Sequence, residues 1–255
     1  MKRFIFCADL HYGFERRNGH KIALHDEKAW GAVLAFAKDF KPDVWIMGGD
    51  MLDCGVVSHH NHGKPGATEG LKLLADAVEG RELFIKPVEE IMGKGELVYL
   101  VGNHEDWLND LSDKLPAIEG LLDLSSLLKL KRWKVIPQGG AYNLGKLTFV
   151  HGDAIKGGEH CAKSAVVGYE RNVRFGHFHS HQTYTKNSAL DYKNSKTGIC
   201  VPCLCGKKPK YGEGAANRWS QGFLFGYVWE GGFYNDYVVT IIEGKCVIGG
   251  KLYRG

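Results

Sequence analysis

Five short polar clusters contain the side chains of this sequence that could do chemistry. They are Asp9-Leu10-His11, Gly49-Asp50-Met51-Leu52-Asp53, Gly102-Asn103-His104-Glu105, His151-Gly152-Asp153 and Gly176-His177-Phe178-His179. Carboxylate, imidazole and amide oxygen together suit a hard-to-borderline divalent ion such as Mn²⁺, Fe or Zn²⁺. A single Asp-x-His pair is common by chance, but five ordered clusters in one chain favour a metal centre.

Each cluster lies where a short apolar run ends, and each run is typical of a buried strand. The runs cover residues 3–8, 44–47, 97–101, 147–150 and 173–175. In open α/β sheets, ligands bind beyond the carboxyl ends of the strands, so the five clusters could converge on one crevice. Residues at i and i+2 of an extended segment point the same way, which pairs Asp9 with His11 and His177 with His179.

Amphipathic stretches between these runs predict helices. They cover residues 26–40, 71–92 with breaks near Gly80 and Pro87, and 116–130. Strands separated by helices indicate βαβ units, an α/β fold and a mixed, centrally parallel sheet. Residues 186–219 are rich in Lys, Gly, Asn and Pro and predict a surface loop, followed by strands at 222–229, 237–242 and 245–248. No linker divides residues 1–255, so we expect a single domain with a loop insertion at about 186–219.

The composition is that of an ordinary globular protein. With 255 residues, 44% hydrophobic and 24% charged, the chain differs from disordered, collagen-like and coiled-coil sequences. A net charge of +4 argues against a protein that coats duplex DNA. Seven cysteines, an odd number, argue for reduced thiols. No apolar run reaches the roughly 18–20 residues that span a bilayer, so we expect a cytoplasmic protein, or one of the host cytoplasm if phage-encoded.

The order D-x-H, G-D-x-x-D, G-N-H-E, H, G-H-x-H over residues 9–179 resembles the calcineurin-like metallophosphoesterase superfamily. The resemblance implies a four-layer α/β/β/α sandwich of two mixed sheets flanked by helices, with two adjacent divalent metals. The matching positions are Asp9, His11 and His179 for the first metal, Asn103, His151 and His177 for the second, and Asp50 as the bridge between them. His104 would lie beside the scissile phosphate, supported by Asp53.

Elementary chemistry is compatible with these implied roles. Two cations roughly 3.5–4 Å apart need a shared anionic ligand and can clamp both oxygens of an in-line displacement at phosphorus. Binding to a metal lowers the pKa of a water molecule far below its bulk value, toward about 7, so a metal-activated hydroxide is available as nucleophile. A histidine with a carboxylate partner can protonate the leaving alkoxide. Mn²⁺ is the metal we expect, with Fe, Zn²⁺, Ni²⁺ and Mg²⁺ as alternatives.

Departures from relatives narrow the expected function. Protein Ser/Thr phosphatases of the superfamily continue G-D-x-x-D with Arg-Gly, whereas Cys54-Gly55 follows here. The layout, including Trp107, is similar to small stand-alone phosphoesterases of phage and bacteria and, more loosely, to an Mre11-type nuclease domain without its cap. We therefore expect a phosphodiesterase acting on nucleic acid or a nucleotide. A phosphomonoesterase acting on a small substrate and an inactive nucleic-acid-binding scaffold are the alternatives.

Two further groups could contact a substrate. His59, His60 and His62 follow Asp53 in the chain and could reach a substrate phosphate, or they could lie on a solvated loop. A basic aromatic loop could bind a phosphodiester backbone or be only a solvated face; it contains Lys207, Lys208 and Lys210.

Three thiols fall within six residues, at Cys200, Cys203 and Cys205. A structural zinc would normally require a fourth ligand, for which only Cys161 or His181 suggests itself. The spacing instead favours small apolar residues on a strand.

Overall fold

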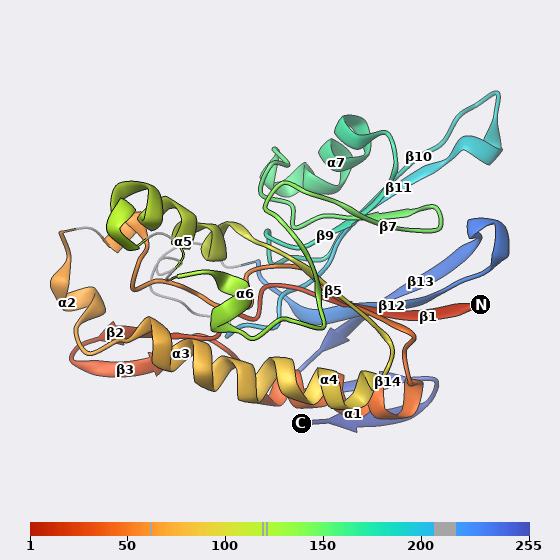
Figure 1. Cartoon of the computed structure of the whole chain (residues 1–255). Helices are drawn as coiled ribbons and strands as arrows, with labels where there is room; N and C mark the ends of the chain where they lie inside the picture. The colour runs from red at the N-terminus through yellow and green to blue at the C-terminus, as the bar shows by residue number, and fades with distance from the viewer. Residues whose placement is uncertain (62, 119, 121, 207–217) are drawn as a thin grey trace.

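Two mixed β-sheets pack face to face, and helices cover the outer face of each sheet (Figure 1). This arrangement is seen in a computed structural model that describes residues 1–61, 63–118, 120, 122–206 and 218–255. The four-layer α/β/β/α sandwich predicted from the sequence is thereby confirmed.

The six-stranded sheet has the order β13-β12-β1-β4-β5-β6. Its strands are β1 (Lys2–Cys7), β4 (Val44–Met47), β5 (Glu96–Leu100), β6 (Lys134–Ile136), β12 (Gln221–Val228) and β13 (Tyr234–Ile241). Strands β1, β4, β5 and β6 run parallel, whereas β12 pairs antiparallel with both β1 and β13. The parallel strands point their carboxyl ends in one direction, as the βαβ pattern predicts.

The five-stranded sheet has the order β10-β11-β9-β8-β7. Its strands are β7 (Tyr142–Leu144), β8 (Leu147–Phe149), β9 (Asn172–Phe175), β10 (Gln182–Lys186) and β11 (Lys196–Cys200). Strands β8, β9 and β11 run parallel, with an antiparallel strand at each edge. The prediction of a surface loop at 186–219 is therefore wrong for residues 196–200, whose polar neighbours hid a short strand. Residues 207–217 lie outside the described part of the chain.

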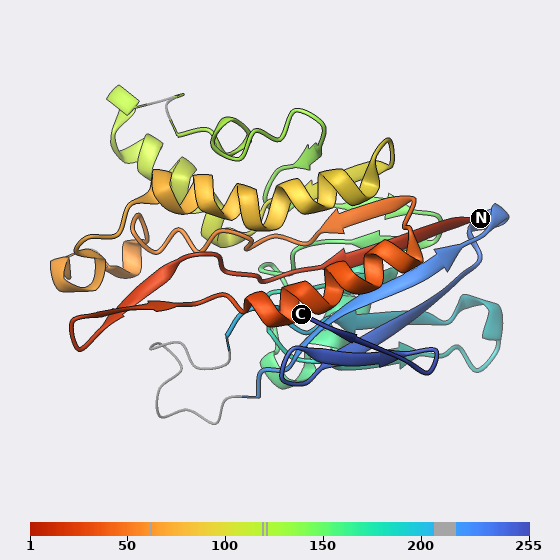
Figure 2. The same cartoon turned by 90° about the horizontal axis from the view of Figure 1, so that it is seen from below.

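Two small hairpins complete the β structure. They are β2 (Phe14–Arg17) with β3 (His20–Ala23), and β14 (Lys245–Ile248) with β15 (Lys251–Arg254). The first hairpin lies next to α2 (Pro65–Thr68) and the second packs on α1 (Glu27–Phe40), as Figures 1 and 2 show.

Helices α1, α3 (Leu73–Gly80) and α4 (Lys86–Met92) cover the six-stranded sheet, and α7 (Cys161–Tyr169) covers the other (Figure 2). In the described part of the chain the remaining α-helices are α5 (Asn103–Lys114) and α6 (Leu124–Leu127). The 3-10 turns there are η1 (His59–Asn61), η3 (Pro116–Ile118), η4 (Gly158–His160), η5 (Tyr192–Asn194) and η7 (Glu230–Gly232).

Two predictions about helices are wrong. The helix expected at 71–92 does not break at Gly80, because a π-helical turn, η2 (Arg81–Ile85), joins α3 to α4. Pro87 follows directly after that π-helical turn, in the first turn of α4, and the helix continues through it. The helix expected at 116–130 is instead divided into η3 and α6, since Gly120 has φ 76° and Asp123 caps a new helix.

Successive side chains of β1 point to opposite faces of the sheet, so this strand contributes to two hydrophobic cores. Phe4 and Phe6 face the second sheet, while Ile5 and Cys7 face the helices. All four side chains are fully buried. Each large apolar side chain buried in this way contributes about 1.5–3 kcal/mol. Among the described residues, no helix combines the length and the apolar character needed to cross a bilayer.

One ion pair connects the two sheets. Arg174 on β9 donates from Nε and Nη2 to the two carboxylate oxygens of Asp236 on β13, and from Nη1 to the carbonyl oxygen of Thr197 at 2.7 Å. The Arg174 side chain is 1% exposed and that of Asp236 is 8% exposed. On folding, both charged groups lose their hydration and gain direct contacts with each other. If one partner is removed, water cannot reach the remaining charge to replace it.

Arg174→Met should lower the free energy of unfolding by about 3–5 kcal/mol, because it leaves the Asp236 carboxylate buried without a partner. The double variant Arg174→Met/Asp236→Leu should regain most of that stability. Urea denaturation of both variants measures the difference. A double variant as unstable as the single one would contradict the ion-pair explanation.

Candidate metal centre

The five polar clusters meet at one edge shared by the two sheets. Strands β1, β4 and β5 of the first sheet lead into Asp9, Asp50 and Asn103, and β8 and β9 of the second lead into His151 and His177. Parallel strands end on the same side of their sheet, and the face-to-face packing aligns the two sets of ends. The ligand-type side chains that meet at this edge thus come from both sheets.

The first group contains Asp9, His11 and His179, whose ligand atoms lie within 4.8 Å of one another. His11 Nε2 lies 3.2 Å from His179 Nε2, and His179 Nε2 lies 3.6 Å from Asp9 Oδ1. Asp9 is fully buried and its Oδ1 has no hydrogen-bond partner. A buried carboxylate oxygen without a donor is costly, so this group fits a cation.

The second group contains Asp50, His151 and His177, again within 4.8 Å. The Oδ1 atom of Asn103 lies 3.0 Å from both His151 Nε2 and His177 Nδ1. His151 Nδ1 donates to the Gly48 carbonyl oxygen at 2.8 Å, so in the neutral ring Nε2 carries a lone pair. That lone pair faces the amide oxygen, an arrangement that only a proton or a metal ion between them makes favourable.

Asp50 lies between the two groups. Its Oδ2 is 3.3 Å from His151 Nε2 and 3.9 Å from His11 Nε2. Burial alone would raise the pKa of Asp50, but the neighbouring imidazoles, with His151 first, hold it well below its usual range. Burial likewise lowers the pKa of His151, yet the Asp50 charge raises it to about 10. The site therefore attracts positive charge strongly.

His104 stands beside the two groups rather than in either. Its Nδ1 donates to the backbone oxygen of Asp53 at 2.7 Å and lies 3.5 Å from the Asp53 carboxylate. Its Nε2 lies 3.9 Å from Asp50 Oδ2, and its ring lies against that of Trp107, with centroids 4.1 Å apart and the planes tilted by 36°. Burial lowers the pKa of His104, but the charges of Asp50 and Asp53 raise it to about 9. The same Asp53 carboxylate also accepts from His11 Nδ1 at 3.1 Å.

Glu105 is the important residue that the sequence patterns did not assign. Its buried carboxylate accepts five hydrogen bonds, from the backbone N–H groups of Asp50, Met51, Leu52 and Gly102 and from the Tyr99 hydroxyl, at 2.6–3.1 Å. Glu105 thereby fixes the loop after β4 against the loop after β5. Its place at the third position of α5 was the available signal, since Glu there often accepts from the N-cap backbone.

The ligand-bearing backbone is unusual. Five predicted ligands have φ between 49° and 68°, namely Asp9, His11, Asp50, His177 and His179. This left-handed region is disfavoured for residues with a Cβ and clusters at functional sites. Close packing adds a second restriction: a Cβ on Gly102 would lie 2.1 Å from Asp50 Oδ1, which explains the glycine before Asn103.

A cavity of about 640 Å³ opens beside His104, between β2 and residues 58–71. Its walls include the rings of Phe14 and Trp107 and the cationic side chains of Arg16 and Lys64. His60 lines this cavity, while the exposed His59 lies against the His60 and Trp107 rings at 3.9 and 5.8 Å. His62, Lys207, Lys208 and Lys210, also predicted as substrate contacts, lie outside the described residues.

Four of the seven cysteines lie in two pairs. Cys161 and Cys200 pack together in the apolar core under α7, and Cys200 is the last residue of strand β11. Cys203 and Cys205 instead lie beside His179, with which they form a further group of potential ligands, in addition to the two groups above and to His11, Asp53 and His104. Neither Cys161 nor His181 belongs to that group, and all seven thiols are buried and free of disulfides.

A family model of calcineurin-like phosphoesterases matches residues 2–196. The match covers most of the chain, including every strand end described above, and the chain belongs to this family. It is therefore a metal-dependent phosphoester hydrolase, as the sequence motifs predicted. A comparison with curated proteins finds no match.

Glu105→Gln should lower the free energy of unfolding by more than about 3 kcal/mol, because the amide NH₂ would face backbone donors in place of a carboxylate oxygen. Affinity for Mn²⁺ should fall by about 10–100-fold, as Asp50 loses its support. Urea denaturation and titration calorimetry measure the two effects.

Asp110→Asn, on the exposed side of the same helix, is the matched control and should change the free energy of unfolding by less than about 0.5 kcal/mol. Equal effects of the two variants would contradict the role of Glu105.

Proposed function

We propose that this phosphoesterase is a binuclear phosphodiesterase whose substrate is nucleic acid or a nucleotide. The observation that carries the proposal is the position of Asp50. Its Oδ2 atom lies 3.9 Å from His11 Nε2 in the first group and 3.3 Å from His151 Nε2 in the second. The same oxygen lies 3.9 Å from Nε2 of His104. A cavity adjoins that point, and its walls include aromatic and cationic side chains as well as the carboxylates of Glu15 and Asp53.

Two divalent ions fit the two ligand groups. Asp9, His11 and His179 would hold one, Asn103, His151 and His177 the other, and Asp50 both. The orphaned Asp9 Oδ1 and the opposed lone pairs of Asn103 and His151 support this assignment. Oxygen and imidazole donors in this mixture favour Mn²⁺. When bound, such ions supply Lewis acidity at the phosphate and a nucleophilic water.

The protein itself supplies the proton for the leaving group. His104 donates its Nδ1 proton to the Asp53 carbonyl oxygen, which orients Nε2 toward the position between Asp50 and the cavity. A proton on Nε2 can then pass to the departing alkoxide oxygen, leaving the imidazole neutral. Trp107, which lies against the ring, restricts it to this orientation.

The cavity supports a diester over a monoester. A diester carries a second group esterified to the phosphorus atom, which must extend away from the metal centre. The cavity offers space for that group. Phe14 and Trp107 provide aromatic surface for a base, and Arg16 and Lys64 provide charge for a neighbouring phosphate. A small monoester would need neither feature.

The proposal is tested with protein stripped of metal and reconstituted with Mn²⁺. Elemental analysis should give two ions per chain, and kcat/KM should be at least about tenfold higher for bis-p-nitrophenyl phosphate than for p-nitrophenyl phosphate. Asp50→Asn should lose both ions and both activities, because it removes the shared anion. One ion per chain would overturn the binuclear assignment, and a preference for the monoester would identify a phosphomonoesterase.

His104→Ala separates proton donation from metal binding. Metal content should be unchanged, since His104 lies outside the seven proposed ligands. The loss in kcat should be about 10²–10⁴-fold for a nucleoside ester, whose alkoxide needs a proton, and much smaller for a nitrophenyl ester. The ratio of the two losses is the measured quantity. Equal losses would mean that His104 only positions the phosphate, and loss of metal would contradict the ligand assignment.

A further inference from the structure

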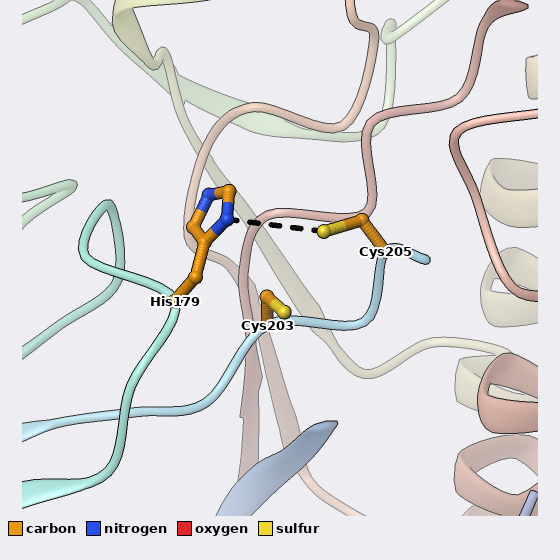
Figure 3. A group of neighbouring side chains, drawn as sticks. All are labelled: His179, Cys203 and Cys205. Atoms are coloured by element: carbon orange, nitrogen blue, oxygen red, sulfur yellow. Dashed lines mark hydrogen bonds between the residues drawn. The ribbon is translucent and has the colours of Figure 1, made fainter. Parts of the chain in front are cut away.

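Two cysteines lie directly behind one of the proposed metal ligands, and the phosphoesterase function makes no use of them. Figure 3 shows the thiols of Cys203 and Cys205 beside the ring of His179. They flank Leu204 in an extended segment, so their side chains emerge on the same side. His179 directs Nε2 toward Asp9 and His11 and its other nitrogen, Nδ1, toward Cys205.

We propose that Cys203, Cys205 and His179 form a separate site for a soft, thiophilic metal ion. One ligand atom from each residue lies within 4.8 Å of the other two, and Cys205 Sγ is 3.8 Å from His179 Nδ1. An ion roughly 2.3 Å from a sulfur and about 2.0–2.1 Å from an imidazole nitrogen separates those two atoms by about 3.6–3.8 Å. The observed spacing of Cys205 and His179 therefore accommodates an ion with little movement of this pair, and Cys203 lies within 4.8 Å of both.

The backbone fixes the thiols before any ion binds. Leu204 N–H donates to the Asp9 carbonyl at 3.1 Å and Cys203 N–H to the Ser220 carbonyl at 3.1 Å. The Cys205 carbonyl accepts from Gln221 Nε2 at 2.9 Å. Cys203, Cys205 and His179 are 0%, 2% and 5% exposed. A preorganised, dry group of donors loses little entropy on binding.

The donor set selects the class of ion. Two sulfurs and one nitrogen favour Cu⁺, Zn²⁺ or Cd²⁺, whereas Mn²⁺ and Mg²⁺ prefer oxygen. Within the described residues no fourth His, Cys, Asp or Glu joins the group, which suits the low coordination number of Cu⁺. Binding releases three protons to solvent, one from each thiol and one from His179 Nδ1. The imidazole ring would then join this site to the phosphoesterase centre through its two nitrogens.

Cd²⁺ added to the Mn²⁺-loaded protein is a direct probe, because Cd²⁺ gives an ultraviolet charge-transfer band only with thiolate ligands. We expect one equivalent to produce the band. Cys203→Ala and Cys205→Ala should each weaken Cd²⁺ binding at least about 100-fold, since loss of even an outer partner costs 10–100-fold. Cys161→Ala is the matched control, because Cys161 is equally buried but belongs to the other cysteine pair, and it should keep the band.

X-ray absorption at the cadmium edge of the unmodified protein provides a measurement that does not depend on the folding of any variant. Two sulfur ligands per cadmium are expected. No band, no sulfur in the first shell, or a band that survives both Cys203→Ala and Cys205→Ala would overturn the proposal. Because the readout is thiolate ligation, these outcomes are distinct from a failure of Mn²⁺-dependent phosphodiesterase activity.

Discussion

The fold concentrates buried negative charge at one place, and much of the structure is arranged to tolerate it. Asp9 and Asp50 are at most 1% exposed, so water cannot hydrate their carboxylates. Five imidazoles, from His11, His104, His151, His177 and His179, surround them, and still one Asp9 oxygen has no donor. Because an unpaired buried carboxylate is expensive, this edge of the sandwich is stable only with added positive charge. The binding of divalent ions and the stability of the fold are therefore coupled.

Holding such groups together requires a scaffold that cannot relax. Left-handed backbone at Asp9 and Asp50 would flatten into ordinary extended chain if the loops were free. Glu105 prevents this at Asp50 by binding the loops after β4 and β5 at once. The two sheets are held in register by packing and by the Arg174–Asp236 pair. Strain at the ligands is thus balanced by hydrogen bonds and packing away from them.

The sequence predicted the layers of the fold and which polar side chains the structure brings together at one edge, because both depend on local patterns. Apolar runs ending in polar motifs mark buried parallel strands whatever their partners. Strand β11 was missed because its apolar residues are few and its neighbours are polar. The roles of Glu105 and Cys205 could not be predicted for another reason, which is that they depend on contacts with distant parts of the chain. Glu105 binds the backbone of Asp50, 55 residues away, and Cys205 contacts His179, 26 residues away. Spacing within a motif carries no information about such contacts.

His179 illustrates how one side chain can belong to two chemical environments. On one side of the ring lie the carboxylate of Asp9 and the imidazole of His11, which are hard or borderline donors. On the other side lie two sulfurs, which are soft. A histidine that ligates through Nε2 commonly donates its second N–H to a carbonyl or carboxylate, which fixes the ring. At His179 the Cys205 thiol takes that position, 3.8 Å from Nδ1, so the ring has a weaker and more polarizable partner. When that thiol exchanges its proton for a soft metal ion, as we propose, the orientation of His179 changes with the chemical state of Cys205.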